Sequence, residues 1–158
     1  MRHYYLDYKK GKKRWDKFNN RFNKNCRFLI MEKKSYENWD EQFVNYDKYQ
    51  MLPLKIEKLI EAEHELDNYL NYIITKIKEN FDELYLLERD IDNFYINLHQ
   101  GNESFIYPPY PHGDYVLFDF LDDNYIFVPP DNIYIYIFGS KLKKVFLELI
   151  DQEYFEKI

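Results

Sequence analysis

The sequence has a single cysteine, Cys26, and four isolated glycines among its 158 residues. One cysteine excludes an internal disulfide, which favours a reducing compartment. Four separated glycines exclude a glycine-rich phosphate loop. No apolar run approaches the roughly 20 residues needed to span a bilayer, and no hydrophobic segment follows the basic N-terminus as in a signal peptide. We therefore expect a cytoplasmic protein without a membrane segment.

The sequence also lacks the residue spacings of known catalytic and metal sites. Its four histidines and one cysteine form no HxxH, HExxH or cysteine-containing zinc pattern, and no serine stands in a nucleophile elbow. We therefore expect no metal, no cofactor and no catalytic residue. The alternative is a small enzyme with a site around His112 and Asp114. Imidazoles beside carboxylates can bind a metal or transfer protons, and the residues considered for this are His99, His112, Asp114 and Asp119.

Charge is divided unequally along the chain, and aromatic residues are abundant. Residues 1–34 carry twelve Lys or Arg and three Asp or Glu, a formal charge of +9, whereas the remaining residues carry −15. Such a division is typical of a basic arm for nucleic acid or of an acidic face for a basic partner, unless the two parts neutralise each other in the fold. Aromatic residues make up 20% of the chain and 17 of them are tyrosines, which suit cores and recognition surfaces alike.

The structural pattern is clearest in residues 105–146. Residues 133–138 alternate Ile with Tyr or Phe, so both faces of that strand are apolar and it should lie inside a sheet. Gly139 ends the strand, Ser140 can cap a helix, and apolar residues then recur at helical spacing. This stretch predicts an antiparallel meander followed by a packed helix. Its strands are predicted at 114–120, 125–128 and 133–138, with a turn at 121–124.

Helical patterns predominate before this stretch. Trp15, Phe18 and Phe22 recur at helical spacing, which indicates a core face or, beside the neighbouring lysines and arginines, a nucleic-acid surface. The other predicted elements are a strand or arm at 4–8, a loop at 9–13, a strand at 27–31, a short helix at 35–43, a poorly patterned connection at 46–52, a long amphipathic helix at 54–80, and strands at 82–88 and 93–99.

These elements predict one α+β domain spanning residues 1–158. We expect N-terminal helices that include the long amphipathic helix, an antiparallel sheet of about five strands and a C-terminal helix. The basic segment, residues 1–34, is expected to be partly mobile.

Two parts of the chain resemble a small bacterial family of unknown function. Residues 111–115 (PHGDY), a short strand and residues 135–139 (IYIFG) are similar to the family's C-terminal part. Residues 15–18 (WDKF) resemble its N-terminal Trp-aromatic helix. The resemblance implies a fold and no mechanism. Family members often carry histidines in two groups, where this chain has residues 87–90 (LERD) and 127–130 (FVPP), so an activity that rests on those histidines is not implied.

The missing catalytic spacings, the compact size and the acidic, tyrosine-rich turns favour a binding protein over an enzyme. We interpret the chain as a small acidic inhibitor, of the toxin-immunity or phage anti-defence type, that occludes a partner protein with a basic surface. Its expected contacts are Tyr107, Tyr110, His112, Asp122, Asp123 and Asp131. The other alternative is nucleic-acid binding through Lys9, Lys10, Lys12, Lys13 and Arg14.

Overall fold

The computed structural model describes residues 1–24, 39–51, 75–88, 93–102, 116–129, 134–151 and 155–158. Their strands form one antiparallel sheet of eight strands in the order β1-β4-β3-β5-β6-β7-β2-β8. The strands are β1 (Arg2–Leu6), β2 (Tyr46–Met51), β3 (Glu83–Glu88), β4 (Asn93–Asn97), β5 (Val116–Asp119), β6 (Tyr125–Val128), β7 (Tyr134–Phe138) and β8 (Phe155–Lys157). The helices are α1 (Tyr8–Phe22), the 3-10 helix η1 (Trp39–Glu41) and α4 (Ser140–Asp151), and residues 75–78 are also helical.

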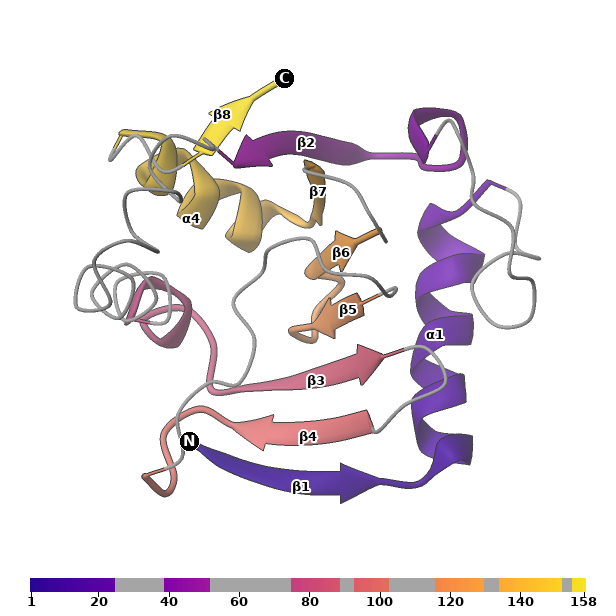
Figure 1. Cartoon of the computed structure of the whole chain (residues 1–158), viewed down its shortest axis with the longest axis vertical. Coiled ribbons are helices and arrows are strands. Elements are labelled where there is room, and N and C mark those ends of the chain that lie inside the picture. Colours follow the sequence, from indigo (N-terminus) through magenta and orange to yellow (C-terminus); the bar gives the residue numbers. More distant parts are fainter. Residues whose placement is uncertain (25–38, 52–74, 89–92, 103–115, 130–133, 152–154) are drawn as a thin grey trace, which may run out of the picture.

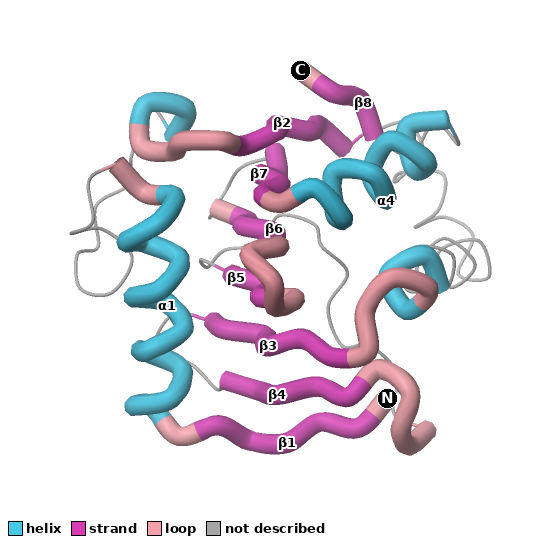
Figure 2. Tube along the Cα trace, turned by 180° about the vertical axis from the view of Figure 1, so that it is seen from behind, coloured by secondary structure: helices cyan, strands magenta, loops and turns pink. Residues whose placement is uncertain are grey.

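The sheet is the middle layer of three. Figure 1 shows α1 on one side of the sheet and α4 on the other, and Figure 2 shows the same arrangement from behind. Helix α1 runs across the strands from the β1 edge towards β2 (Figure 1). This mixed arrangement of helices and antiparallel sheet confirms the predicted α+β class, with more strands than the five predicted.

The predicted meander is confirmed as β5, β6 and β7, which pair antiparallel with their neighbours. On β7, Ile135 and Ile137 join the core beneath α4, whereas Tyr136 and Phe138 join the core beneath α1. All four side chains are at most 1% exposed. A strand buried on both faces is what the alternation of Ile with aromatic residues predicted.

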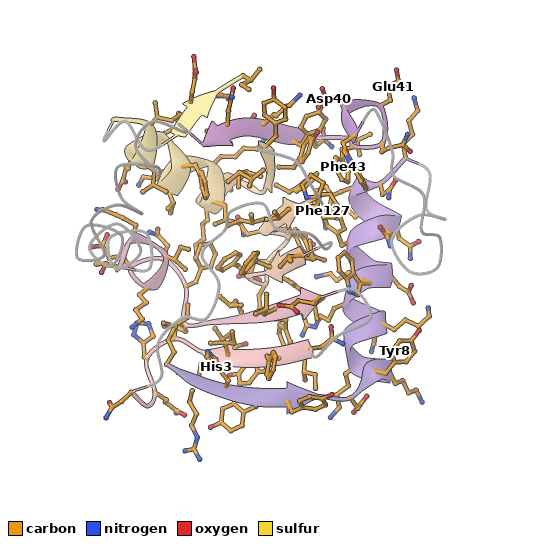
Figure 3. All side chains as sticks on the ribbon, in the orientation of Figure 1. His3, Tyr8, Asp40, Glu41, Phe43 and Phe127 are labelled. Atoms are coloured by element: carbon orange, nitrogen blue, oxygen red, sulfur yellow. The ribbon has the colours of Figure 1, made fainter. Side chains whose placement is uncertain are left out.

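Each face of the sheet carries its own hydrophobic core. The core on the α4 side contains mainly aliphatic residues and includes Leu142, Val145, Phe146 and Leu149 of the helix. The core on the α1 side is mostly aromatic, and Phe18 lies at its centre, with its ring centroid 5.1 Å from that of Tyr125 and 5.0 Å from that of Phe138. The aromatic stripe of α1 is therefore a core face, the first of the two interpretations given above. The aromatic cluster continues to Trp39, Phe43, Phe127 and Tyr136, and Figure 3 shows Phe43 and Phe127 close together.

Helix α1 begins at Tyr8, so the loop predicted at residues 9–13 is wrong. The Asp7 side chain accepts a hydrogen bond of 2.9 Å from the backbone N–H of Lys10 and caps the helix, which lowers the pKa of Asp7. Gly11 lies within the helix against β4, where a Cβ atom would come 2.7 Å from Nδ2 of Asn93. This glycine therefore allows close packing of helix on sheet, and the lysines around it are helical.

Strand β2 corrects the prediction of an unpatterned connection at residues 46–52. It pairs antiparallel with β7 on one side and β8 on the other, and Tyr49 is fully buried. Burial raises the pKa of Tyr49 to about 12. Its sequence, YDKYQM, has polar residues at three of its six positions and no regular alternation, so its strand state depends on the two neighbouring strands rather than on its own pattern. Strand β8 was not predicted.

Several predicted elements lie outside the described residues. These are the strand at 27–31, the first part of the helix at 35–43 and most of the long helix at 54–80. Residues 39–41 form the 3-10 turn η1, and residues 75–78 are helical, which agrees with the predicted end of the long helix. The strands predicted at 82–88 and 93–99 are confirmed as β3 and β4. The strand or arm predicted at 4–8 overlaps β1, which ends at Leu6, and residue 8 already belongs to α1.

The turn between β5 and β6 and the start of α4 are joined by one side chain. The turn predicted at 121–124 is confirmed, and its positive φ angles of 66°, 48° and 59° fall on Leu121, Asp122 and Asp123. Asn124 Oδ1 then accepts hydrogen bonds from the backbone N–H groups of Lys141 (3.1 Å) and Leu142 (3.3 Å). Asn124 thus supplies the cap predicted for Ser140, which is instead the first residue of the helix.

Replacing Ile135 by Asp should destabilise the protein by roughly 3–5 kcal/mol, because a charge without a partner would lie at a position that is 0% exposed. Urea unfolding measures the change. Leu147 is 52% exposed on α4, so Leu147→Asp is the matched control and should change stability by about 0.5 kcal/mol or less. Equal stabilities for the two variants would contradict the central place of β7.

Candidate functional site

A cleft lies where α1 passes over β1, β4 and β3. Its volume is about 1070 Å³. Figure 3 marks this end of the molecule by Tyr8, at the start of α1. Aromatic and polar side chains of the sheet form one wall, and cations of α1 form the other. The lining residues are Tyr4, Tyr5, Leu6, Glu83, Tyr85, Tyr95, Asn97 and Gln100 from the sheet side, with Lys10, Lys13, Arg14 and Lys17 from α1. We call this the tyrosine–cation cleft.

Three tyrosines form a row across the sheet wall. Strand register places Tyr4 of β1 opposite Tyr95 of β4, and Tyr95 opposite Tyr85 of β3. The ring centroids of Tyr4 and Tyr95 are 5.7 Å apart, and those of Tyr95 and Tyr85 are 5.3 Å apart. The Tyr95 hydroxyl donates to Glu83, and this hydrogen bond raises the pKa of Tyr95. The Tyr4 hydroxyl donates to Oε1 of Gln100 at 3.4 Å, so two of the three tyrosines in the row have hydroxyls bonded to neighbouring side chains.

The helix wall comes from a second stripe on α1. Lys10, Arg14, Lys17 and Arg21 follow one another at i, i+4, i+7 and i+11, beside the buried stripe that contains Phe18. One face of the helix therefore fills the aromatic core, and the adjacent face carries cations over the outer part of the sheet. This spacing was visible in the sequence. It went unrecognised because residues 9–13 were interpreted as a loop.

Arg14 connects the cleft to the interior. Its Nη1 lies 3.0 Å from Oδ2 of Asp119, a carboxylate that is 0% exposed, and its guanidinium Cζ lies 3.6 Å from the ring centroid of Tyr85. Burial raises the pKa of Asp119, and this effect is opposed by a hydrogen bond from the backbone N–H of Leu121 and by the Arg14 charge. Arg14 therefore has two partners that fix its position, one ionic and one aromatic.

The cations of the stripe differ in how far the protein itself neutralises them. Asp123 lies 3.4 Å from Lys17 Nζ and also binds Arg21. Lys10 Nζ lies 3.4 Å from the exposed carboxylate of Asp7. Lys13 forms no ion pair with any residue that the structure describes. Lys10 and, beside the stripe, Lys13 therefore present positive charge to the cleft, whereas Lys17 and Arg21 bind α1 to the β5–β6 turn.

The inhibitor surface predicted from the sequence is described only in part. Tyr107, Tyr110, His112 and Asp131 lie outside the described residues. Asp122 is exposed in the β5–β6 turn, and Asp123 beside it is bound by Lys17 and Arg21. The structure thus brings Asp123 to α1 and uses its charge within the chain. Recognition of a basic partner by these six residues stays a prediction.

The alternative sites fare differently. Lys9, Lys10, Lys12, Lys13 and Arg14, the residues predicted to bind nucleic acid, all lie on α1, and three of them line the cleft. The predicted enzyme site stays a prediction, since His112 and Asp114 lie outside the described residues. His99 Nε2 is 3.4 Å from Asp82, whereas Asp119 binds Arg14. Among the described residues, no three His, Cys, Asp or Glu side chains are grouped so that they could hold a metal.

No family model, curated protein or solved structure matches the chain. The resemblance of residues 111–115 and 135–139 to a bacterial family of unknown function therefore stays a prediction. Within the described part of the chain, every helix is too short or too polar to cross a membrane.

Replacing Asp119 by Asn should remove part of the pH dependence of stability. The pKa of Asp119 is raised above its ordinary value of 3.8 in the folded state, so the folded protein holds this proton more tightly than the unfolded chain does. The contribution of Asp119 to stability should therefore fall as pH rises from about 3.8 through the raised pKa, and stay constant above it.

Urea unfolding of both proteins at a series of pH values tests this. The free energy of unfolding of the parent, minus that of the Asp119→Asn variant, should decrease with rising pH across this window. A difference that increases with pH would show that the Arg14 charge outweighs burial at this carboxylate.

Proposed function

We propose that this chain is a binding protein whose tyrosine–cation cleft takes an anionic ligand. The observation that carries the proposal is the charge of the helix wall. Lys10 and Lys13 line the cleft, and neither forms an ion pair with a buried carboxylate among the residues that the structure describes. They lie one helical turn from Arg14 and Lys17, whose partners hold them in place. Glu83, the one carboxylate among the lining residues, accepts a hydrogen bond from Tyr95.

The helix also lowers the cost of binding. The backbone of α1 is fixed by the Asp7 cap and by the aromatic core around Phe18, so the cations are arrayed before a ligand arrives. The Lys10 side chain is 71% exposed. Its ammonium group can therefore bind an anion without breaking a buried ion pair. Several cations along one wall of a cleft attract an extended anion more strongly than scattered surface charges do.

This proposal keeps the class expected from the sequence, a binding protein, and changes the sign of the expected partner. The acidic β5–β6 turn, which the sequence predicts to bind a basic partner, contains Asp123, and the carboxylate of Asp123 already lies beside two cations of α1. A basic partner would have to compete with them. An anionic ligand would instead meet lysines that lack such competition.

The double variant Lys10→Gln, Lys13→Gln should bind inorganic polyphosphate more weakly than the parent protein. Each lysine that contacts a polyanion releases about one counterion, so the slope of log affinity against log salt should fall by about two when both are removed. Isothermal titration calorimetry at three salt concentrations measures the affinity and its salt slope for each protein.

The matched control is Lys78→Gln, Lys144→Gln. These lysines lie away from the cleft, Lys144 on α4 and Lys78 in the helical residues 75–78, and their removal changes the net charge by the same amount. Only the cleft variant should lose affinity. Equal losses in both variants would indicate an effect of net charge alone and would contradict the proposed site.

A further inference from the structure

We infer that the anionic ligand of the tyrosine–cation cleft is single-stranded nucleic acid, with bases against the sheet wall and phosphates against α1. The inference rests on the proposed function and adds the chemical class of the ligand. Its basis is the separation of two kinds of group. The cations that line the cleft come from α1, and the aromatic rings that line it come from the sheet.

The helix wall has the spacing of a phosphate-binding surface. Its cations repeat about once per helical turn from Lys10 to Arg21, in line along one side of the helix. A row of cations with this spacing can contact successive phosphates of a nucleic-acid backbone, and such contacts do not distinguish one base sequence from another. The unneutralised end, at Lys10 and Lys13, would take the first phosphates, and Arg14 and Lys17 would continue the path.

The sheet wall has the features of a base-binding surface. Tyr4 and Tyr95 are neighbours in the tyrosine row, and Tyr4 is 39% exposed at the outermost strand. Aromatic side chains on a sheet stack bases whatever their sequence, because every base has a π face. Arg14 covers Tyr85 at 3.6 Å and extends the platform, since guanidinium planes also stack on bases.

Polar groups beside the rings match the edges of bases. Glu83, Asn97 and Gln100 line the same wall. Glu83 accepts a hydrogen bond from the Tyr95 hydroxyl, and Gln100 Oε1 accepts one of 3.4 Å from the Tyr4 hydroxyl, so the second carboxylate oxygen of Glu83 and the amino group of Gln100 are the groups left for a base. A carboxylate accepts hydrogen bonds from the amino group of cytosine, and carboxamides both donate and accept. A ligand made only of phosphate would use none of these groups, and it would leave the carboxylate of Glu83 close to its own charge. A ligand with bases satisfies both walls.

A single strand fits the cleft better than a duplex. The cations that line the cleft lie across it from the tyrosines of the sheet, so a ligand that contacts both walls must offer phosphates and the faces of bases at the same time. In a duplex the π faces of the bases are covered by their neighbours. An exposed single strand offers those faces to the tyrosine row.

The test uses the full chain and a fluorescent single strand of about ten nucleotides, within the usual site size of such proteins. Anisotropy measures its affinity against a hairpin duplex of equal charge, inorganic polyphosphate and polyglutamate. We expect the single strand to bind most tightly. Tyr4→Leu and Tyr95→Leu should each weaken single-strand binding by about 5- to 150-fold and leave polyphosphate binding unchanged. Tyr4→Phe and Tyr95→Phe, which keep the ring, should retain most of the affinity.

Tyr134→Leu is the matched control. Tyr134 is a partly exposed tyrosine of β7 with Lys48 Nζ 4.3 Å from its ring centroid, so it offers the same pair of groups outside the cleft. Its removal should leave single-strand binding unchanged. Circular dichroism establishes that each variant is folded, and Tyr4 at the sheet edge can be replaced without opening the core. Photocrosslinking of a 5-bromouracil strand should label Tyr4 or Tyr95.

The outcomes separate the two proposals. If the parent protein binds neither polyphosphate nor the single strand at low salt, the proposed anion site is wrong. If polyphosphate binding depends on Lys10 and Lys13 but the tyrosine variants bind the single strand as the parent does, the ligand class is wrong and the anion site stands. Tighter binding of the duplex or of polyglutamate than of the single strand would also overturn this inference.

Discussion

The central strands β5, β6 and β7 carry apolar side chains on both faces, so water must be excluded from both sides of the sheet. This constraint requires a layer on each side. Helix α4 supplies one, directly after β7, and its first turn is capped by Asn124 from the neighbouring β5–β6 turn. Helix α1 supplies part of the other layer, together with η1 and Phe43, although it precedes the meander by about a hundred residues. The two helices therefore pack on opposite faces of the same three strands.

On the α1 side, the apolar core covers mainly the central strands of the sheet. The outer strands extend beyond this core, and the cleft forms there. On the α1 face the central strands present Phe127, Tyr136 and Phe138, which are at most 1% exposed. The outer strands β3, β4 and β1 present Tyr85, Tyr95 and Tyr4 in the same layer. Tyrosine tolerates partial exposure because its hydroxyl can remain hydrated. Beneath the single helix α1, the sheet therefore presents buried aromatic residues on its central strands and partly exposed tyrosines on its outer strands.

Elements whose own pattern specifies them could be predicted from the sequence, and elements that depend on distant partners could not. The alternation at residues 133–138 fixes both the strand and its burial, so β7 was correctly predicted together with β5, β6 and α4. Strand β2 has no such pattern and owes its state to β7 and β8 on either side. The start of α1 was missed because Gly11 among lysines is typical of a loop, whereas the reason for the glycine is Asn93 on a strand some eighty residues later. The cleft was missed for the same reason, since Tyr4, Tyr85 and Tyr95 become neighbours only through strand pairing.

The position of the cations on α1 also determines the electrostatic force on a charged ligand as it approaches the protein. The chain has a formal charge of −6, so at long range it repels an anion. Within the cleft, the ligand would instead meet Lys10 and Lys13 at contact distance. At physiological ionic strength the Debye length is about 8 Å, so the distant acidic residues are screened more strongly than the contacts in the cleft. Salt then acts in two directions, because it weakens the repulsion by the whole molecule and the attraction by the cleft. Association should therefore depend less steeply on salt than it would for a uniformly basic protein with the same number of phosphate contacts.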